Sequence, residues 1–269
     1  MAEKKFDIRL EDLTVGYGGK PVLSDVTVTI PNGKITVILG GSGCGKSTLL
    51  RHMLYLNKPI SGEIYVGDQA MSSLTGADFR RIRQRMGVLF QDGALLGSLT
   101  LAQNVGLPLT EHTKLSKAEV LERVRAKLAL VGLDEFLDYY PNELSGGMRK
   151  RAGLARAMIM DPSVLFCDEP TSGLDPVNAA ELDHLLLEVC ESFKMTMVVV
   201  SHDLQSLNVI ADHVVVLGEG TCIFEGALDE LLHTEDPYLK QFLGRKAVER
   251  DTPRLTMPPL DPSVFKLKR

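Results

Sequence analysis

The chain has 269 residues, 44% of them hydrophobic, and carries a formal net charge of −5 at neutral pH. A chain of this length and hydrophobicity buries one sizeable core with room for an inserted subdomain, so the disordered and fibrous classes are excluded for most of it. The acidic balance argues against the usual nucleic-acid binder, which is strongly basic, and we expect no nucleic-acid partner.

The sequence predicts neither a membrane span nor a secretory signal. The apolar runs Met195–Val200 and Val214–Leu217 are far shorter than the ~20 residues that a membrane helix needs. The segment from Met1 to Leu10 contains charged side chains and no apolar core of a signal peptide. We therefore expect this polypeptide to remain in the cytosol.

The first part of the chain is expected to form antiparallel hairpins and then a buried strand. Short runs rich in β-forming residues are separated by glycine and proline turns. These runs are Ile8–Leu13, Val26–Ile30 and Ile64–Val66. Lys34–Leu39 is almost continuously apolar and ends in a glycine cluster, which predicts a strand buried on both faces. A helix should begin at Lys46.

Helical and strand patterns alternate in the rest of the chain. The apolar spacing within Ser116–Val131 predicts a helix, with Ser116 as N-cap and Glu119 completing a capping box. A second helix is predicted at Ser145–Met160. Strands are predicted at Val164–Cys167, Met195–Val200 and Val214–Leu217. Such alternation implies an α/β fold with a parallel sheet and right-handed crossovers.

A phosphate-binding loop is predicted between the strand that ends at Leu39 and the helix from Lys46. The pattern GxxxxGK[ST] is matched by Gly40, Gly41, Ser42, Gly43, Cys44, Gly45, Lys46 and Ser47, with Thr48 next. Glycines let backbone N–H groups converge on phosphates, and the helix start adds its positive dipole end. Lys46 would contribute a charge to the β- and γ-phosphates, and Ser47 a hydroxyl to Mg²⁺. The loop alone predicts only nucleotide binding, which kinases and GTPases share.

Two adjacent carboxylates follow the predicted strand Val164–Cys167. Ligands of open α/β sheets bind at the carboxyl edge, where Asp168 and Glu169 should lie. Because neighbouring side chains on a strand point to opposite faces, the two acids can hold different roles. We expect Asp168 to hold magnesium through water and Glu169 to polarise the attacking water.

A second anion site is predicted where the helix Ser145–Met160 begins. The N–H groups of Ser145, Gly146 and Gly147 lack partners within the helix and lie at its positive dipole end. Residues 144–148 read LSGGM and run directly into a basic helix. This arrangement resembles the LSGGQ signature of the ATP-binding-cassette (ABC) family, with methionine in place of glutamine.

The resemblance to the ABC family covers Asp7 to roughly Gly244, and the motifs occur in the family's order. It implies a P-loop NTPase fold with a RecA-like parallel-sheet core, an antiparallel β subdomain and an inserted α-helical subdomain at roughly 93–160. The ABC ATPase domain would then span 1–244. The resemblance also implies an enzyme that uses ATP and Mg²⁺. Its homodimer would place the signature of one chain on the ATP bound to the other.

The remaining site residues take their roles from the same resemblance. Gln91, in the coupling loop, and His202, the switch histidine, would act in catalysis beside Glu169, and Gln91 would also contact magnesium. Tyr17 would stack on adenine, and Asp175, in the dimer loop, would join the signature residues as a contact in trans. The alternatives are a surface aromatic at Tyr17, a polar residue at a strand end for Gln91 and a satisfied structural histidine at His202.

A narrower resemblance concerns the uncharged segment 93–110. The wording at 91–96 and 104–113, together with Met148, is similar to the ATPase subunits of Mla-type phospholipid transporters, which serve MCE-protein systems. The leucines of the segment predict an apolar groove for a helix of the membrane partner. The alternative is that the segment simply packs into the helical subdomain.

The Mla-type resemblance implies phospholipid trafficking between bacterial membranes by a peripheral subunit at the cytoplasmic face of the inner membrane. It implies membrane permease subunits, an MCE-domain lipid-binding protein and a STAS-domain regulator as partners. The alternative is the ATPase of an ABC importer for a small solute such as an amino acid or metal. Residues 245–269 are expected to form an extended basic tail with prolines, which docks on the opposite subunit or on a regulator. The alternatives are a solvated chain end and attraction to anionic lipid.

Overall fold

The computed structural model describes residues 6–244. It divides the chain into two compact units, Met1–His233 and Thr234–Arg269, and each is described by itself. The tail expected at 245–269 lies outside the described residues. Among the helices of residues 6–244, none combines the length and the apolar character needed to cross a bilayer.

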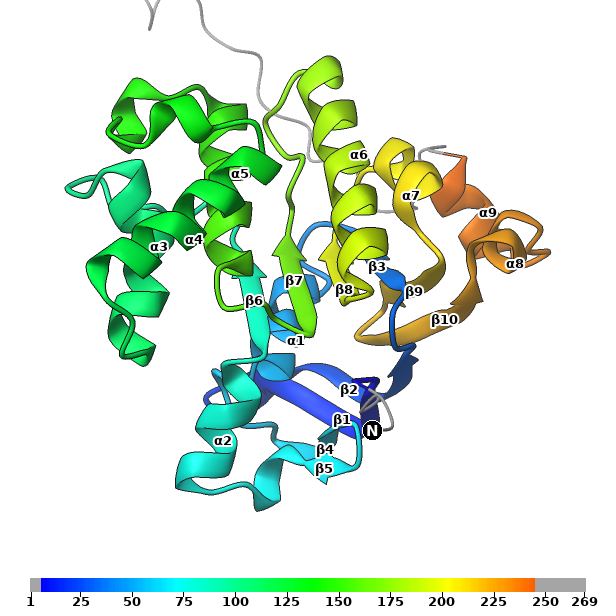
Figure 1. Cartoon of the computed structure of the whole chain (residues 1–269). Coiled ribbons are helices and arrows are strands. Elements are labelled where there is room, and N and C mark those ends of the chain that lie inside the picture. The colour runs from blue at the N-terminus through cyan, green and yellow to red at the C-terminus, as the bar shows by residue number, and fades with distance from the viewer. Residues whose placement is uncertain (1–5, 245–269) are drawn as a thin grey trace, which may run out of the picture. The chain divides into compact units, whose positions relative to one another are not determined.

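The first unit contains an antiparallel sheet of four strands in the order β2-β1-β4-β5 (Figure 1). These strands are β1 (Ile8–Tyr17), β2 (Lys20–Ile30), β4 (Ser61–Val66) and β5 (Gln69–Ala70). Ile8 pairs with Ile30, so the predicted hairpin is confirmed. Strand β1 continues past the predicted end at Leu13, because the register shifts around Asp12, whose φ is 47°, and the ladder then resumes.

The second sheet of this unit has six strands in the order β10-β9-β3-β8-β7-β6. They are β3 (Ile35–Gly40), β6 (Met86–Leu89), β7 (Val164–Asp168), β8 (Thr196–Val200), β9 (His213–Gly218) and β10 (Thr221–Ala227). Strand β10 is antiparallel to β9, and the other pairings are parallel, as predicted. Strand β3 is buried along its whole length, as its apolar run indicates. Strands β6 and β10 are additional to the predicted strands.

Helix α1 (Lys46–Met53) begins at the predicted residue and packs against strands of both sheets. Its Leu49 and Met53 belong to one core with Val15 of β1 and Phe166 of β7, and all four side chains are at most 1% exposed.

Three helices pack against one another in the region expected to be the helical subdomain. They are α3 (Leu101–His112), α4 (Lys117–Leu130) and α5 (Gly146–Met158). The capping box of α4 is confirmed: Ser116 Oγ accepts from the Glu119 N–H at 3.3 Å, and Glu119 Oε2 accepts from the Ser116 N–H at 2.7 Å. Helix α3 is additional to the predicted helices, and Thr100 and Gln103 cap it in the same reciprocal way.

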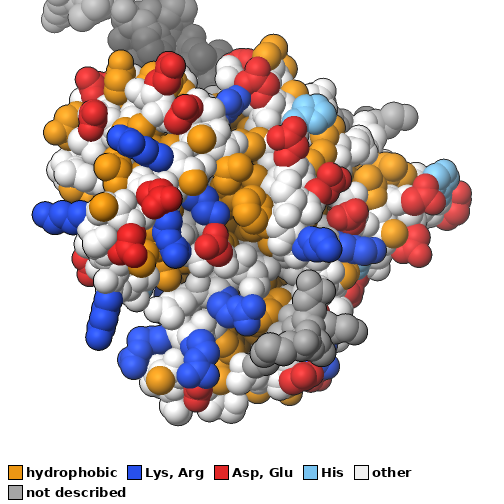
Figure 2. Space-filling view, in the orientation of Figure 1, with side chains coloured by type: hydrophobic (Ala, Val, Ile, Leu, Met, Phe, Trp, Pro, Cys, Tyr) orange, Lys and Arg blue, Asp and Glu red, His pale blue; other side chains and the backbone are white. Residues whose placement is uncertain are grey.

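The crossovers from β7 to β8 and from β8 to β9 are made by α6 (Pro176–Phe193) and α7 (Leu204–Ile210), which lie near each other in Figure 1. The shorter elements are α2 (Gly76–Arg83), α8 (Leu228–Leu232) and the 3₁₀ turns Met71–Ser73, Asp134–Phe136 and Pro141–Glu143. The second unit contributes α9 (Pro237–Leu243), capped by the carboxylate of Asp236. Figure 2 shows acidic and basic side chains interspersed on the same face of the molecule.

Candidate functional site

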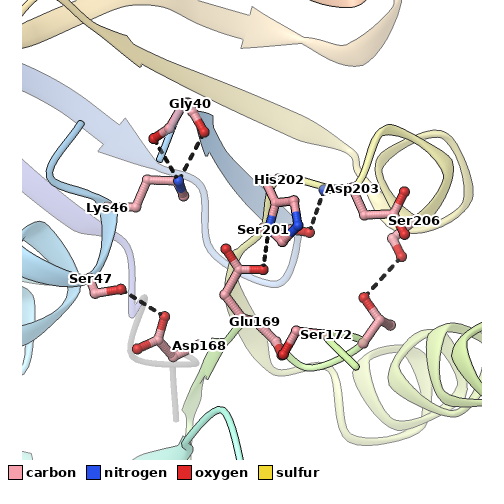
Figure 3. Close-up of polar contacts among 12 residues, drawn as sticks. Gly40, Lys46, Ser47, Asp168, Glu169, Ser172, Ser201, His202, Asp203 and Ser206 are labelled. Carbon is pink, nitrogen blue, oxygen red and sulfur yellow. Dashed lines mark hydrogen bonds and ion pairs between the residues drawn. The ribbon is translucent and has the colours of Figure 1, made fainter. Parts of the chain in front are cut away.

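The carboxyl edge of the parallel sheet gathers most of the candidate residues, because neighbouring strands end in different motifs. In the spatial order β3, β8, β7 and β6, the strands lead into the glycine loop after Gly40, into His202, into Glu169 and into Gln91. Figure 3 shows the loop lysine, the Asp168–Glu169 pair and His202 at this edge. Parallel strands thus deliver residues from distant parts of the sequence to one site.

The glycine loop between β3 and α1 surrounds the Lys46 ammonium. Lys46 Nζ donates to the carbonyl oxygens of Gly40 at 2.9 Å and Gly41 at 3.1 Å, and the residue is only 8% exposed. Gly45 has a φ of 105°, and a Cβ added there would lie 2.9 Å from Leu23 Cγ. Within the described residues no side chain caps α1, so its first N–H groups are available to an anion.

Ser47 and Asp168 form an oxygen-rich contact between α1 and β7. Ser47 Oγ donates to Asp168 Oδ1 at 3.1 Å. Burial raises the pKa of Asp168, although the hydrogen bond from Ser47 opposes that rise. A hydroxyl and a carboxylate this close are hard oxygen ligands, of the kind that Mg²⁺ takes together with phosphate oxygens. Residues 6–244 contain no cluster of three or more His, Cys, Asp or Glu side chains that could hold a metal by itself.

Glu169 turns away from Asp168 and contacts His202. Glu169 Oε2 lies 2.7 Å from His202 Nδ1, and the side chains are 15% and 63% exposed, respectively. The two acids diverge as expected, but strand alternation is not the cause. Glu169 lies beyond the end of β7 with a φ of 51°, so a left-handed turn separates the side chains. The Glu169 N–H donates to the Val200 carbonyl at 2.9 Å, which fixes this turn against β8.

Tyr17 and Gln91 are both exposed. Tyr17 ends β1 with 46% exposure, and its hydroxyl accepts a hydrogen bond from Arg51 at 3.4 Å. A hydrogen bond with Thr48 lowers the pKa of Tyr17. Both contacts hold the aromatic ring beside α1. Gln91 is exposed two residues after β6, and its side chain makes no hydrogen bond within residues 6–244.

The signature residues form the start of α5. Ser145 is the N-cap, and its Oγ accepts from the Met148 N–H at 3.2 Å. Gly146 and Gly147 are the first residues of the helix, so their N–H groups have no acceptor within it. Among the described residues, no hydrogen bond links this turn to the glycine loop of the same chain.

Asp175 lies next to the signature. It caps α6 by accepting from the N–H groups of Val177 and Asn178 at 3.1 Å each, and the Asn178 side chain lowers the pKa of Asp175. A Cβ added at Gly147 would lie 3.3 Å from Asn178 Oδ1. The structure therefore brings together the residues that were expected to act in trans.

Sequence reasoning missed two basic residues of α5 that contact the site. Lys150 Nζ donates to the carbonyl oxygens of Glu169 at 3.3 Å and Ser172 at 2.5 Å. Arg156 donates to the carbonyl oxygens of residues 93 and 94, at 2.8 Å each. A basic run on a helix usually indicates a solvated face, and only the 4% exposure of Lys150 reveals a different role.

An open cavity of about 600 Å³ lies beside the Gln91 loop, between α2, β6, α3 and α5. Phe90, Leu107 and Pro108 give it an apolar lining. The side chains of the uncharged segment 93–110 fall into two sets. One set is buried in the helical region, and the other lines this cavity. The buried set includes Leu101, Val105 and Leu109. The alternative that the segment packs into the helical region is therefore confirmed for the buried set, whereas a groove for a membrane partner stays a prediction.

Comparisons with known proteins agree with this geometry. A family model described as "ABC transporter" matches residues 23–172. The probable ribonucleotide transport ATP-binding protein Mkl of Mycobacterium tuberculosis is 40% identical over 241 residues, which cover 90% of this chain and 67% of that protein. The methionine import ATP-binding protein MetN 2 of Pseudomonas entomophila is 39% identical over 224 residues, covering 83% and 67%.

Solved structures share the fold. CbiO1 of Clostridium perfringens, part of the ABC transporter complex CbiONQ, has a TM-score of 0.78 and 30% identity, covering 90% of this chain and 97% of that one. The ATP-binding cassette MJ0796, solved as a dimer bound to ADP and Pi, has a TM-score of 0.74 and 31% identity, covering 82% and 98%. The chain therefore belongs to the ABC transporter ATP-binding family. It is the ATP-hydrolysing subunit of a transporter, built on the predicted P-loop NTPase cassette.

Proposed function

We propose that the residues at the carboxyl edge bind ATP and activate water for its hydrolysis. The glycine loop, residues 40–48, holds the phosphates through its open N–H groups and the Lys46 ammonium. The position of Lys46 Nζ, bonded to the Gly40 and Gly41 carbonyls, supports this role because the charge already lies inside the loop. Tyr17 stacks on the adenine, a role that its exposed ring and its contacts with α1 support.

Glu169 polarises the attacking water, and His202 orients the Glu169 carboxylate. The 2.7 Å contact between Glu169 Oε2 and His202 Nδ1 is the observation that carries this assignment, since a base held by a third group is the usual arrangement for water activation. Gln91 reaches the same edge from the end of β6 and assists the water and the metal.

Ser47, Asp168 and Gln91 hold Mg²⁺. The hydrogen bond of 3.1 Å between Ser47 Oγ and Asp168 Oδ1 supports this assignment, because it brings two hard oxygen ligands within reach of the loop that holds the phosphates. The ion, when bound, neutralises charge on the β- and γ-phosphates.

Two copies of the chain complete each other's ATP sites. Ser145, Gly146, Gly147 and Asp175 of one copy contact the ATP held by the glycine loop of the other. The start of α5 supports this role, because the N–H groups of Gly146 and Gly147 have no acceptor within the helix. In the described part of the chain, no hydrogen bond joins them to the glycine loop of the same copy. The dimeric form of MJ0796, which is 31% identical, is a further support.

The dimer lies at the cytoplasmic face of a bacterial inner membrane and drives permease subunits. The cavity lined by Phe90, Leu107 and Pro108 fits an apolar helix of a permease, and its position beside Gln91 would link that helix to the ATP site. An MCE-domain lipid-binding protein and a STAS-domain regulator complete the assembly. Their inclusion rests on the Mla-type resemblance of residues 91–96 and 104–113.

The transported substrate is phospholipid, moved between bacterial membranes. This assignment rests on the same Mla-type segments together with Met148 in the signature. The second candidate is import of a small solute, and the observation that favours it is the 39% identity to a methionine import ATP-binding protein. The proposed ATP-binding and catalytic residues do not distinguish these two functions, because they act on ATP and not on the transported substrate.

ATP-dependent movement of the cargo by the purified transporter separates the two functions. The complex is reconstituted in vesicles that contain labelled phosphatidylethanolamine or phosphatidylglycerol, and ATP-dependent removal of the label is measured. We expect removal with the native chain and none with the Lys46→Ala variant. Transport of methionine with no effect on the labelled lipid would replace the phospholipid assignment by the importer.

A further inference from the structure

Lys150 is a buried cation in the middle of α5. Its residue is 4% exposed, and no carboxylate within residues 6–244 lies within salt-bridge distance of its ammonium. Burial accordingly lowers the pKa of Lys150, although Asp92 and Glu169 oppose the shift. A buried charge without an ion-pair partner is costly, so the groups that hold it are informative.

The Lys150 ammonium is held by oxygen atoms of the turn that follows β7. It donates to the Glu169 carbonyl at 3.3 Å, the Ser172 carbonyl at 2.5 Å and Ser172 Oγ at 3.3 Å. Ser172 Oγ in turn donates to the Glu169 carbonyl at 2.9 Å, and the Ser172 N–H donates to the same oxygen at 3.2 Å. The Glu169 carbonyl therefore accepts three hydrogen bonds.

This network fixes a backbone conformation that Glu169 does not favour. Its φ of 51° is in the left-handed region, which costs a non-glycine residue about 1 kcal/mol or more unless its surroundings hold it. The conformation also decides where the Glu169 carboxylate points, because it turns that side chain away from Asp168 and toward His202.

Helix α5 is attached to the Gln91 loop by a second set of contacts. Arg156 donates to the carbonyl oxygens of residues 93 and 94, and a Cβ added at Gly153 would lie 2.8 Å from Gly93 Cα. One helix thus carries three contacts: the signature at its start, Lys150 hydrogen-bonded to the turn of Glu169, and Arg156 at the cavity beside Gln91.

We propose that Lys150 is a positioning residue for Glu169: its ammonium holds the turn after β7 so that the carboxylate faces the attacking water, and it ties this turn to the helix of the signature. The inference rests on the proposed role of Glu169 in water activation. The hydrogen bonds of Lys150 go to the carbonyl and hydroxyl oxygens of this turn, so its proposed effect on the Glu169 carboxylate is indirect. Movement of α5, driven from the signature or from the cavity, would then shift the turn of Glu169.

The test compares Lys150→Met with the native full-length chain, co-purified with its membrane subunits. ATP turnover is divided by the number of sites that bind a fluorescent ATP analogue, so that loss of folded protein does not count. We expect kcat to fall about tenfold or more while KM for ATP changes by less than about twofold, because the phosphate contacts remain. Lys150→Arg, which keeps the charge and the donors, should recover part of the rate.

Two further variants exclude a general effect on folding. Lys127→Met removes a lysine that is only partly buried, pairs with Asp161 at 2.7 Å and has no hydrogen bond to the turn among the described residues, and it should leave kcat unchanged. Lys150→Met placed on Glu169→Gln should cause no further loss, since both changes act on one group. If Lys150→Met lowered the kcat of Glu169→Gln by the same factor as it lowers the kcat of the native chain, the inference would be overturned. A native kcat in Lys150→Met alone would overturn it as well.

Ser172→Ala decides the question if Lys150→Met does not fold. It removes one acceptor of Lys150 and one donor to the Glu169 carbonyl, and kcat should fall severalfold with unchanged nucleotide binding. Native kcat in Ser172→Ala would overturn the inference. Glu169→Gln keeps the two failures apart: near-native turnover in that variant would remove the proposed role of Glu169 as well, whereas its inactivity beside an active Lys150→Met would reject only the role of Lys150.

Discussion

Glu169 Oε2 lies 2.7 Å from His202 Nδ1, although 33 positions separate the two residues in the sequence. They follow the adjacent parallel strands β7 and β8, whose register sets Asp168 beside Val200. Glu169 is the more buried partner and His202 the more exposed one. The pair therefore holds the Glu169 carboxylate through Oε2, which is consistent with its proposed role as the base for water.

His202→Ala should slow ATP turnover by roughly tenfold to a hundredfold, because the Glu169 carboxylate loses the group that orients it. Binding of ATP should stay close to native, since no phosphate contact is removed. Steady-state turnover and nucleotide titration on the same preparation check this. An unchanged kcat would assign His202 a structural role only.

Gly45→Ala should destabilise the chain by about 1 to 3 kcal/mol, because the φ of 105° at this position is unfavourable for alanine. The added Cβ would also lie 2.9 Å from Leu23 Cγ. Thermal unfolding measures the effect. Gly41→Ala is the matched control for stability: Gly41 has no neighbour within 4 Å of an added Cβ and no positive φ. Equal melting temperatures for both variants would contradict the prediction.

The sequence predicts those features of the fold and site that depend on local chemistry. The glycine loop and the Ser116–Glu119 capping box are such features, since each is set by residues a few positions apart. Helix α3 was missed because Gly106 and Pro108 have low helix propensity, which obscured the capping box of Thr100. Tertiary packing favours a small residue at Gly106, as a Cβ there would lie 3.1 Å from Val120 Cγ1 and Val124 Cγ2.

The buried position of Lys150 and the left-handed turn at Glu169 depend on contacts distant in the sequence. Lys150 occurs in the run Arg149–Arg151, which has the composition of a solvated helix face. The positive φ of Glu169 has no composition signal, since glutamate rarely adopts it. Both become evident only when α5 and β7 are brought together.

Stability should fall as the pH drops below the ordinary pKa of histidine, partly because of His213. Burial lowers the pKa of His213, with Lys34 adding to the shift and Glu225 and Glu230 opposing it. Below pH ~6.5 the unfolded chain binds a proton that the folded chain resists, so the free energy of unfolding decreases as pH falls. Above that pH both states are neutral and His213 contributes no slope.

The measurement is the melting temperature between about pH 5 and pH 7 for the native chain and for His213→Gln. The native chain should lose more stability toward low pH than the variant. His184→Gln, which replaces an exposed histidine of α6, should follow the native curve. Parallel curves for the native chain and His213→Gln would show that His213 is not responsible.

Mixed dimers test the shared ATP site. Lys46→Ala removes the phosphate charge, whereas Ser145→Asp keeps a good N-cap and places a carboxylate against the incoming phosphate. Each variant alone should fail to form ATP-bound dimers. A mixture should recover ATP-bound dimers, because one site of each mixed dimer combines the intact Lys46 of one chain with the intact Ser145 of the other. Absence of ATP-bound dimers at every mixing ratio would refute the composite site.

The most direct test of the whole account is the turnover of Glu169→Gln in the assembled transporter. The substitution keeps the size of the side chain and the phosphate contacts while removing the carboxylate that polarises water. We predict that ATP binds with near-native affinity, that turnover falls by about a hundredfold or more, and that ATP-bound dimers accumulate. Near-native turnover by this variant would contradict the central claim that Glu169 activates the water at the carboxyl edge of the sheet.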